Sequence, residues 1–360
     1  GAVYTPNEIS EKIVEKTITT CFKKTKNYDI SILDFGCGTG RFFFSALKYL
    51  KKQTKKSTEE IILENLFAID LDPIAIAILT IKSCLESDNF SDDFLKKLSS
   101  NLICENMLHV KDISKLDSTQ LDYAEIFPRV FKNKGFDIII SNPPYFVLKG
   151  TGNKKGLTKF YEHQKKSIKK ESNYFHQNKF YEKSIQGMLN YYRLSIECML
   201  KISNKNGVLG IICPATLFGD TSASNLRKEL LEKNQIVYLE YFPEKSKLFE
   251  QVAQATSIFI LNKNKQTNKI ELKNNLNDSL TNLDFKTISK IFPNLEIPFI
   301  TKKEWMILEK LGKFKKINQI PKLRNRRGEL DLSLLKNCIT RKNTGYYLIR
   351  GIGIRENQIK

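Results

Sequence analysis

Short apolar runs alternate with segments of helical periodicity along the first 265 residues of the chain. The runs have the length of strands and are rich in branched and aromatic residues; they lie at 31–35, within 61–69, and at 101–104, 136–141, 208–213 and 257–261. The segments with apolar positions every three or four residues lie at 42–50, 73–85 and 183–202. Strands that alternate with helices predict an α/β fold with a doubly wound, mostly parallel sheet.

Polar segments interrupt this pattern and indicate where domains end. They lie at 51–60, 149–170, 262–283 and 302–327. Segment 149–170 contains eight lysines, three glycines and one acid, Glu162, which is typical of a loop. We place a first domain at 1–265, a linker region at 266–300 and the start of a second domain at 301–360.

The charge balance points to a polyanionic partner. The chain carries 59 lysine and arginine residues against 39 acidic residues, a formal net charge of +20. Nucleic acid is the first candidate and an anionic membrane surface the second, while a general compositional bias toward lysine is the alternative. No apolar run approaches the roughly 20 residues that span a bilayer. The seven scattered cysteines and three histidines show no metal-ligand spacing, so we expect a cytoplasmic protein without a metal site.

A glycine-rich turn follows the first predicted strand, in the sequence Leu-Asp-Phe-Gly-Cys-Gly-Thr-Gly at 33–40. Gly36, Gly38 and Gly40 allow the backbone to approach a nucleotide-like ligand closely. Asp34 precedes the turn, where it would repel a pyrophosphate but attract the sulfonium and ammonium groups of S-adenosylmethionine. The Gly-x-Gly-x-Gly spacing therefore favours that cofactor over a dinucleotide.

The second predicted strand ends in an acid-rich turn. Asp70 at the tip of the strand can accept hydrogen bonds from both hydroxyls of a ribose, and its neighbours Ile69 or Leu71 can flank an adenine ring. Asp72 followed by Pro73 is typical of the start of a helix. We interpret Asp70 as a cofactor ligand and Asp72 as a helix cap.

The most specific motif is Asn-Pro-Pro-Tyr-Phe at 142–146, which follows an apolar strand directly. Asn142 is expected at the carboxyl edge of the sheet, where open α/β sheets place their sites. The two prolines fix the turn and the direction of the Pro143 carbonyl. Asn142 Oδ1 and this carbonyl offer two adjacent acceptors, which match the two hydrogens of an exocyclic amine. Tyr145 supplies a flat face on which a planar base can stack.

These motifs resemble those of the S-adenosylmethionine-dependent amino-methyltransferases that modify adenine in DNA, whose signature is Asn-Pro-Pro-Tyr or Asp-Pro-Pro-Tyr. Their order resembles the gamma class of type II, including type IIG, restriction–modification systems. The segment 3–9 resembles the Thr-Pro segment of that class, which implies that Thr5 helps to hold the methionine end of the cofactor. The resemblance covers residues 1–265 and implies a seven-stranded methyltransferase sheet, followed by an incomplete target-recognition domain.

Two positions depart from the pattern of the family. The family usually has Asp-Phe after the third strand, whereas this chain has Asn106 and Met107, with Glu105 as an alternative acceptor for the adenine amine of the cofactor. The family also places a phenylalanine on the opposite face of the flipped base. Phe249 is the better match and Phe242 the alternative, and either aromatic ring can instead be part of the core.

The resemblance implies a site-specific methyltransferase that acts as a monomer on N6 of an adenine flipped out of double-stranded DNA, without a metal. A fused or separate restriction endonuclease is the implied partner. Alternatives are a release-factor glutamine or rRNA methyltransferase, because these enzymes also use Asn-Pro-Pro-Tyr, and a DNA-binding modification subunit that needs a separate specificity chain. The basic segments at 149–170 and 301–360 favour DNA. An N4-cytosine enzyme usually has serine at the position of Asn142, and a C5-cytosine enzyme needs a Pro-Cys pair that this chain lacks.

Overall fold

A computed structural model gives the fold of the chain. It describes residues 5–111, 121–149, 158–246, 254–316, 319–321, 354–355 and 358–359. The chain divides into two compact units, Gly1–Gly312 and Lys313–Lys360. The described part of the second unit includes the antiparallel pair β10 (Ile354–Arg355) and β11 (Gln358–Ile359). Most of the recognition domain expected at 301–360 lies outside the described residues.

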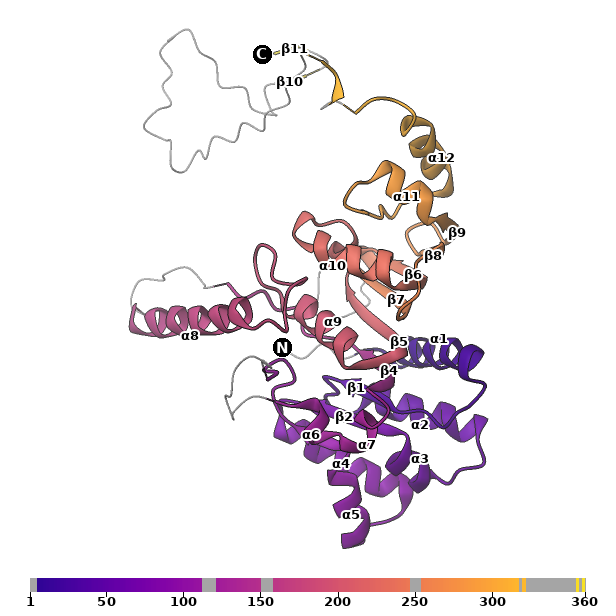
Figure 1. The fold of residues 1–360 in the computed structure, drawn as a ribbon, viewed down its shortest axis with the longest axis vertical. Helices are drawn as coiled ribbons and strands as arrows, with labels where there is room; N and C mark the ends of the chain where they lie inside the picture. Colours follow the sequence, from indigo (N-terminus) through magenta and orange to yellow (C-terminus); the bar gives the residue numbers. More distant parts are fainter. Residues whose placement is uncertain are drawn as a thin grey trace. The chain divides into compact units, whose positions relative to one another are not determined.

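One sheet organises the first unit (Figure 1). Its strands are β1 (Ile32–Phe35), β2 (Leu66–Asp70), β3 (Leu102–Cys104), β4 (Phe136–Ser141), β5 (Ser203–Pro214), β6 (Gln235–Phe242), β7 (Thr256–Asn262), β8 (Lys269–Asn274) and β9 (Ser279–Asp284). Their spatial order is β3-β2-β1-β4-β5-β7-β6-β8-β9. The first five are parallel, and β7 runs antiparallel between β5 and β6. The predicted α/β fold with a mostly parallel sheet is confirmed.

The sheet is larger than we expected, because the described residues form nine strands instead of seven. The two additional strands come from 266–300, where we expected a linker: β8 pairs in parallel with β6, and β9 pairs with β8. In β8, Ile270 and Leu272 are buried whereas Lys269 is exposed. Because buried and more exposed residues alternate along a strand near the edge of the sheet, the sequence of this segment is largely polar, and we interpreted it as a linker. The compact unit continues to Gly312, beyond the boundary expected at 265.

Helices cover both faces of the sheet and create two apolar cores. One core contains side chains of α1 (Asn7–Thr25), α2 (Arg41–Gln53), α3 (Thr58–Glu64), α4 (Pro73–Ser87) and α5 (Asp92–Ser99). The other contains side chains of α6 (Tyr123–Ile126), α7 (Pro128–Phe131), α9 (Tyr191–Ile202), α10 (Ser224–Lys228), α11 (Phe285–Ile291) and α12 (Lys302–Leu311). Short 3₁₀ helices are η1 (Ala215–Phe218), η2 (Thr221–Ala223) and η4 (Glu244–Ser246), and η3 (Glu229–Lys233) is a short π-helix. The sheet is therefore doubly wound. In the described part of the chain, no helix has the length and apolarity needed to cross a bilayer.

The basic segment at 149–170 is helical in part, where we expected a loop. Residues Thr158–Gln177 form α8, which extends away from the sheet in Figure 1. The helix expected at 183–202 instead begins at Tyr191, where the Asn190 side chain caps it. The buried carboxylate of Glu197 explains the later start. It accepts hydrogen bonds from the backbone N–H groups of Glu182, Lys183 and Ser184 at 2.8–3.0 Å, which hold this segment in a turn.

Helix α1 packs directly on the backbone of β5. A Cβ atom on Gly210 would lie 2.1 Å from Thr17 Oγ1 and 3.0 Å from Ile13 Cγ2. Any side chain at this position would therefore displace the helix. Glycine at 210 sets how closely α1 approaches the sheet.

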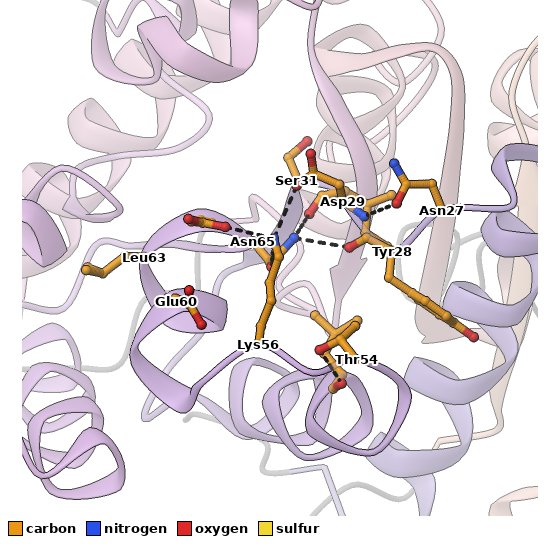
Figure 2. Close-up of polar contacts among 12 residues, drawn as sticks. Asn27, Tyr28, Asp29, Ser31, Thr54, Lys56, Glu60, Leu63 and Asn65 are labelled. Carbon is orange, nitrogen blue, oxygen red and sulfur yellow. Dashed lines mark hydrogen bonds and ion pairs between the residues drawn. The ribbon is translucent and has the colours of Figure 1, made fainter.

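Polar side chains join the starts of β1 and β2 at the amino edge of the sheet (Figure 2). Lys56 Nζ donates to Asp29 Oδ1 at 3.3 Å and to Glu64 Oε2 at 2.8 Å. Asn65 Nδ2 donates to the carbonyl of Ile30 at 2.8 Å. These contacts fix one end of the two strands and leave the residues of the predicted site at the other end.

Candidate active site

The strand ends that carry the predicted site lie along one edge of the sheet. Because β1, β2, β3 and β4 are parallel, Phe35, Asp70, Cys104 and Ser141 share the carboxyl edge. The glycine turn follows β1, Asn106 and Met107 follow β3, and the motif at 142–146 follows β4. The fold therefore brings together motifs that are far apart in the sequence.

The three glycines of the turn have positive φ angles and different surroundings. The φ angles of Gly36, Gly38 and Gly40 are 75°, 50° and 86°, a region that other residues rarely adopt. A Cβ atom on Gly40 would lie 2.5 Å from Leu79 Cδ1, so this glycine allows α2 to pack on α4. A Cβ atom on Gly38 would meet no atom within 4 Å. Gly38 thus presents bare backbone to open space, while Gly40 is required for packing.

Asp70 braces the glycine turn, a role that the sequence analysis missed. Its Oδ2 accepts a hydrogen bond from the Gly38 N–H at 2.7 Å, and its Oδ1 accepts one from the Asp72 N–H at 3.0 Å. A carboxylate oxygen has two acceptor positions, so each oxygen retains one position for a ligand. The neighbouring Leu71 is 61% exposed, as a side chain that flanks a bound ring must be. Asp72 caps α4 as expected, with Oδ1 accepting from Ile74 N at 2.9 Å.

Asp34 contacts α2, whereas we expected it to face the cofactor. Its Oδ2 accepts from the Phe43 N–H at 2.9 Å, and the residue is 3% exposed. Burial raises the pKa of Asp34 well above its usual range, and the charge of Asp70 raises it further. No described residue makes a hydrogen bond to Asp34 Oδ1. The side chain of Asp34 therefore supports the first turn of α2.

The residues after β3 adjoin the glycine turn. Met107 lies beside Gly36, because a Cβ atom on that glycine would be 3.7 Å from Met107 Sδ. Asn106 Oδ1 accepts from the Leu108 N–H at 3.2 Å, so part of its acceptor capacity shapes its own turn. The alternative, Glu105, is exposed. The structure thus places Met107 at the turn and leaves the choice between Asn106 and Glu105 a prediction.

Asn142 is held by a residue from the start of the chain. Its Nδ2 donates to Thr5 Oγ1 at 3.1 Å, and Thr5 is 4% exposed. This bond directs the carboxamide nitrogen toward Thr5, which places the oxygen on the other side of the group. Ser141, which the sequence analysis missed, donates through Oγ to the Phe35 carbonyl at 2.6 Å. The ends of β4 and β1 are therefore tied together beside the glycine turn.

The start of α1 is also tied to the site. Asn7 Oδ1 accepts from Arg41 Nη1, and the hydroxyls of Ser10 and Ser45 lie 3.0 Å apart. Arg41 is the first residue of α2, directly after the glycine turn. These contacts hold the segment that carries Thr5 against the helix that begins at the turn.

The aromatic residues of the predicted site have different environments. Tyr145 is partly buried and packs against both apolar cores, and burial raises the pKa of its phenol well above the usual range. Phe242 is 8% exposed and belongs to a core, so the structure favours a packing role for this alternative. Phe249 lies outside the described residues, and its role stays a prediction. Within the described ranges, no cluster of three His, Cys, Asp or Glu residues is placed to hold a metal ion.

Comparison with known proteins places the chain among restriction–modification proteins. A family model described as Eco57I restriction-modification methylase matches residues 64–249, a range that includes Asp70 and the motif at 142–146. The chain is 25% identical over 301 residues to the type II restriction enzyme and methyltransferase RM.Eco57I of Escherichia coli. That alignment covers 74% of this chain and 28% of the relative, so the chain spans well under half of that protein.

Solved structures share the fold. The type ISP restriction-modification enzyme LlaGI, determined with a DNA substrate mimic, has a TM-score of 0.52 and 19% identity, covering 85% of this chain and 32% of that one. The DrdV–DNA complex has a TM-score of 0.51 and 18% identity, covering 75% of this chain and 27% of that one. The family match extends over more than half of the sequence, and the chain belongs to the Eco57I restriction-modification methylase family.

Proposed function

We propose that this chain is the adenine-specific DNA methyltransferase part of a restriction–modification protein, and that it transfers a methyl group from S-adenosylmethionine to N6 of a flipped-out adenine. The observation that carries the proposal is the position of Asn142, held by Thr5 at the end of β4, next to the strand end that leads into the glycine turn. An acceptor for an exocyclic amine and an open backbone turn for a nucleoside thus lie on neighbouring strands.

The residues at the edge of the sheet fit S-adenosylmethionine. Gly38 offers bare backbone, Asp70 retains acceptor positions for ribose hydroxyls, and Leu71 exposes an apolar side chain suited to an adenine ring. The carboxylate of Asp70, which braces the turn, favours a ligand with positive charge. When bound, the cofactor supplies an electrophilic methyl carbon on a sulfonium. We assign Thr5, Met107 and Asn106 to its methionine and adenine ends.

The motif at 142–146 would prepare the target nitrogen. Asn142 Oδ1 and the Pro143 carbonyl would accept the two hydrogens of N6, which increases the electron density on that nitrogen. Because the bond to Thr5 holds the Asn142 carboxamide before the reaction, its oxygen would also stabilise the positive charge that develops on N6. Tyr145 and, in our assignment, Phe249 would stack on the two faces of the base and offset the stacking that flipping removes.

The known relatives support DNA as the substrate over rRNA or a protein glutamine. RM.Eco57I is a restriction enzyme as well as a methyltransferase, and LlaGI and DrdV were determined with DNA. We extend this substrate class to the present chain. We also place its activity in the cytoplasm, with a restriction nuclease on the same or a separate chain and with target recognition starting at 301–360.

Nucleoside analysis tests the proposal directly. The full-length protein, supplied with tritiated S-adenosylmethionine and duplex DNA, should form N6-methyladenine. Sequencing of DNA from cells that express it should then give the methylated sequence. Labelled N4-methylcytosine, or label in rRNA or protein with none in DNA, would contradict the assignment.

A further prediction concerns the lysines of α8. Lys165, Lys166, Lys169 and Lys170 are all exposed, and none forms an ion pair with an acidic side chain among the described residues. Like charges four residues apart slightly destabilise a helix, which phosphate groups would relieve. Replacing the four lysines by glutamine should weaken binding to duplex DNA of every sequence. Fluorescence anisotropy should also show a shallower salt dependence, by about 0.9 in the log–log slope for each phosphate that the variant no longer neutralises.

A variant with the same charge change elsewhere is the control. Glutamine at 51, 52, 55 and 96 also removes four exposed lysines, near the ends of α2 and α5. This control should keep most of the DNA affinity. An equal loss in both variants would show that net charge matters and the position of α8 does not.

A further inference from the structure

Phe146 exposes an aromatic ring beside the candidate active site. It directly follows Tyr145, yet the two side chains have opposite environments: Tyr145 packs into both cores, and Phe146 is 56% exposed. The ring of Phe146 therefore points away from the core, directly after the tyrosine that we expect to stack on the base. Its apolar surface is available for contact with a ligand.

The backbone and ring of Phe146 are held in place by the residues that precede and begin α9. Tyr191 N–H donates to the Phe146 carbonyl at 2.9 Å, and Leu148 N–H donates to the Leu189 carbonyl at 2.9 Å. The rings of Phe146 and Tyr191 lie 5.6 Å apart with an angle of 58° between their planes. A ring that is already fixed loses little conformational entropy when it binds.

The support of Phe146 continues into α8. The Tyr191 hydroxyl donates to Glu171 Oε1 at 3.1 Å, and His109 Nε2 lies 3.0 Å from the same oxygen. The His109 ring lies 4.5 Å from the ring of Tyr174, also on α8. Glu171 comes directly after Lys169 and Lys170 in the helix. The contacts of Tyr191 with Glu171 therefore connect the ring of Phe146, which is suited to contact with bases, to the helix whose lysines are suited to contact with phosphates.

We propose that Phe146 inserts into the duplex and occupies the position that the flipped adenine leaves; this inference rests on the proposed function. Removing a base from the helix leaves a gap whose neighbouring base pairs have no stacking partner on one side. An apolar side chain held at the rim of the site can fill that gap, as wedges of other DNA-binding proteins do between base steps. Tyr145 then contacts the flipped base while Phe146 contacts the base pairs that remain.

The test compares two duplexes that contain the sequence methylated in cells. In one, the target adenine is paired with thymine; in the other it is mispaired and costs less to flip. Phe146→Ala should methylate the paired duplex about 10- to 100-fold more slowly than the wild type. On the mispaired duplex the difference should fall to about threefold or less, because flipping no longer limits the reaction.

Matched variants separate insertion from other roles. Phe146→Trp should retain most activity on the paired duplex, because it keeps a large stacking face. Met188→Ala, which removes a side chain that is 52% exposed in the adjoining segment, should behave as the wild type on both duplexes. Calorimetry should show unchanged binding of S-adenosylmethionine to Phe146→Ala, which confirms that the site is intact.

Two results would overturn the inference while the proposed function stands: wild-type rates for Phe146→Ala on the paired duplex, or an equal loss on both duplexes. If the wild-type protein methylates adenine in neither duplex, the proposed function fails and the inference fails with it.

Discussion

Replacing Asn142 by alanine should lower the rate of methyl transfer by about 10²–10³-fold, the usual effect of removing one positioned electrostatic partner. The substitution removes the carboxamide oxygen that we assign to the N6 hydrogens. It leaves the glycine turn and Asp70 unchanged, so S-adenosylmethionine should still bind. Single-turnover measurement with tritiated cofactor and duplex DNA gives the rate, and calorimetry gives the affinity.

Because Asn142 also donates a hydrogen bond to Thr5, two further variants are needed to separate this bond from the role of the carboxamide oxygen. Thr5→Val removes the hydroxyl but keeps the carboxamide oxygen, so its effect should fall mainly on the KM for the cofactor and less on turnover. Asn142→Asp keeps an acceptor oxygen but cannot donate to Thr5, and its rate should lie between those of the wild type and Asn142→Ala. Near-normal turnover in Asn142→Ala would refute the proposed role of the carboxamide.

Replacing Asp70 by alanine should weaken binding of S-adenosylmethionine by about 10- to 100-fold, the cost of removing hydrogen bonds to a charged group. The variant lacks the ligand that we assign to the ribose and also releases the Gly38 N–H that shapes the turn. Calorimetry gives the affinity. Alkylation of Cys104 gives a second measurement, because this cysteine is exposed beside Asp70 at the end of β3. Bound cofactor should slow its alkylation in the wild type and much less in the variant.

Asp72→Ala is the matched control for Asp70→Ala. It removes a carboxylate two residues away that caps α4, and among the described residues this carboxylate has no hydrogen bond to the glycine turn. We expect a loss of about 1 kcal/mol in the free energy of unfolding, with cofactor affinity close to that of the wild type. Equal losses of affinity in both variants would show that Asp70 acts through local folding alone.

The sequence predicted the elements whose signals are local. An apolar strand followed by acids and Pro73 predicted the end of β2 and the start of α4. In the structure β2 ends at Asp70 and α4 begins at Pro73, with Asp72 as its cap. Strands β8 and β9 were not predicted because burial at one face of an edge pair leaves a mostly polar sequence. The start of α9 was placed too early because the buried Glu197 holds residues 182–184 through contacts that no periodicity reveals.

For the candidate site, the sequence predicted which residues share an edge of the sheet but not which atoms they contact. The motifs identified Asp70 and Asn142, and the parallel sheet brings both to one edge. Their partners could not be predicted, because Asn142 and Thr5 are 137 residues apart and Asp70 reaches Gly38 across 32 residues. We predicted that Asp34 faces the ligand, but its side chain turns toward the first turn of α2 and accepts a hydrogen bond from Phe43 N–H. The sequence does not reveal this contact, because it depends on how α2 packs on β1.

Gly210 lies outside the candidate site, but it determines how far α1, and with it Thr5, lies from the sheet that carries Asn142. The helix that follows Thr5 lies on β5 at Gly210, and Ile13, which faces that glycine, lies about 9 Å along the helix axis from Asn7, where the helix begins two residues after Thr5. A side chain at position 210 would push α1 away from the sheet and so move the Thr5 hydroxyl that orients Asn142. A substitution at Gly210 would therefore change the geometry around Asn142 without touching it, so the sensitivity of a residue to mutation depends on which helix it positions as well as on its distance from the site.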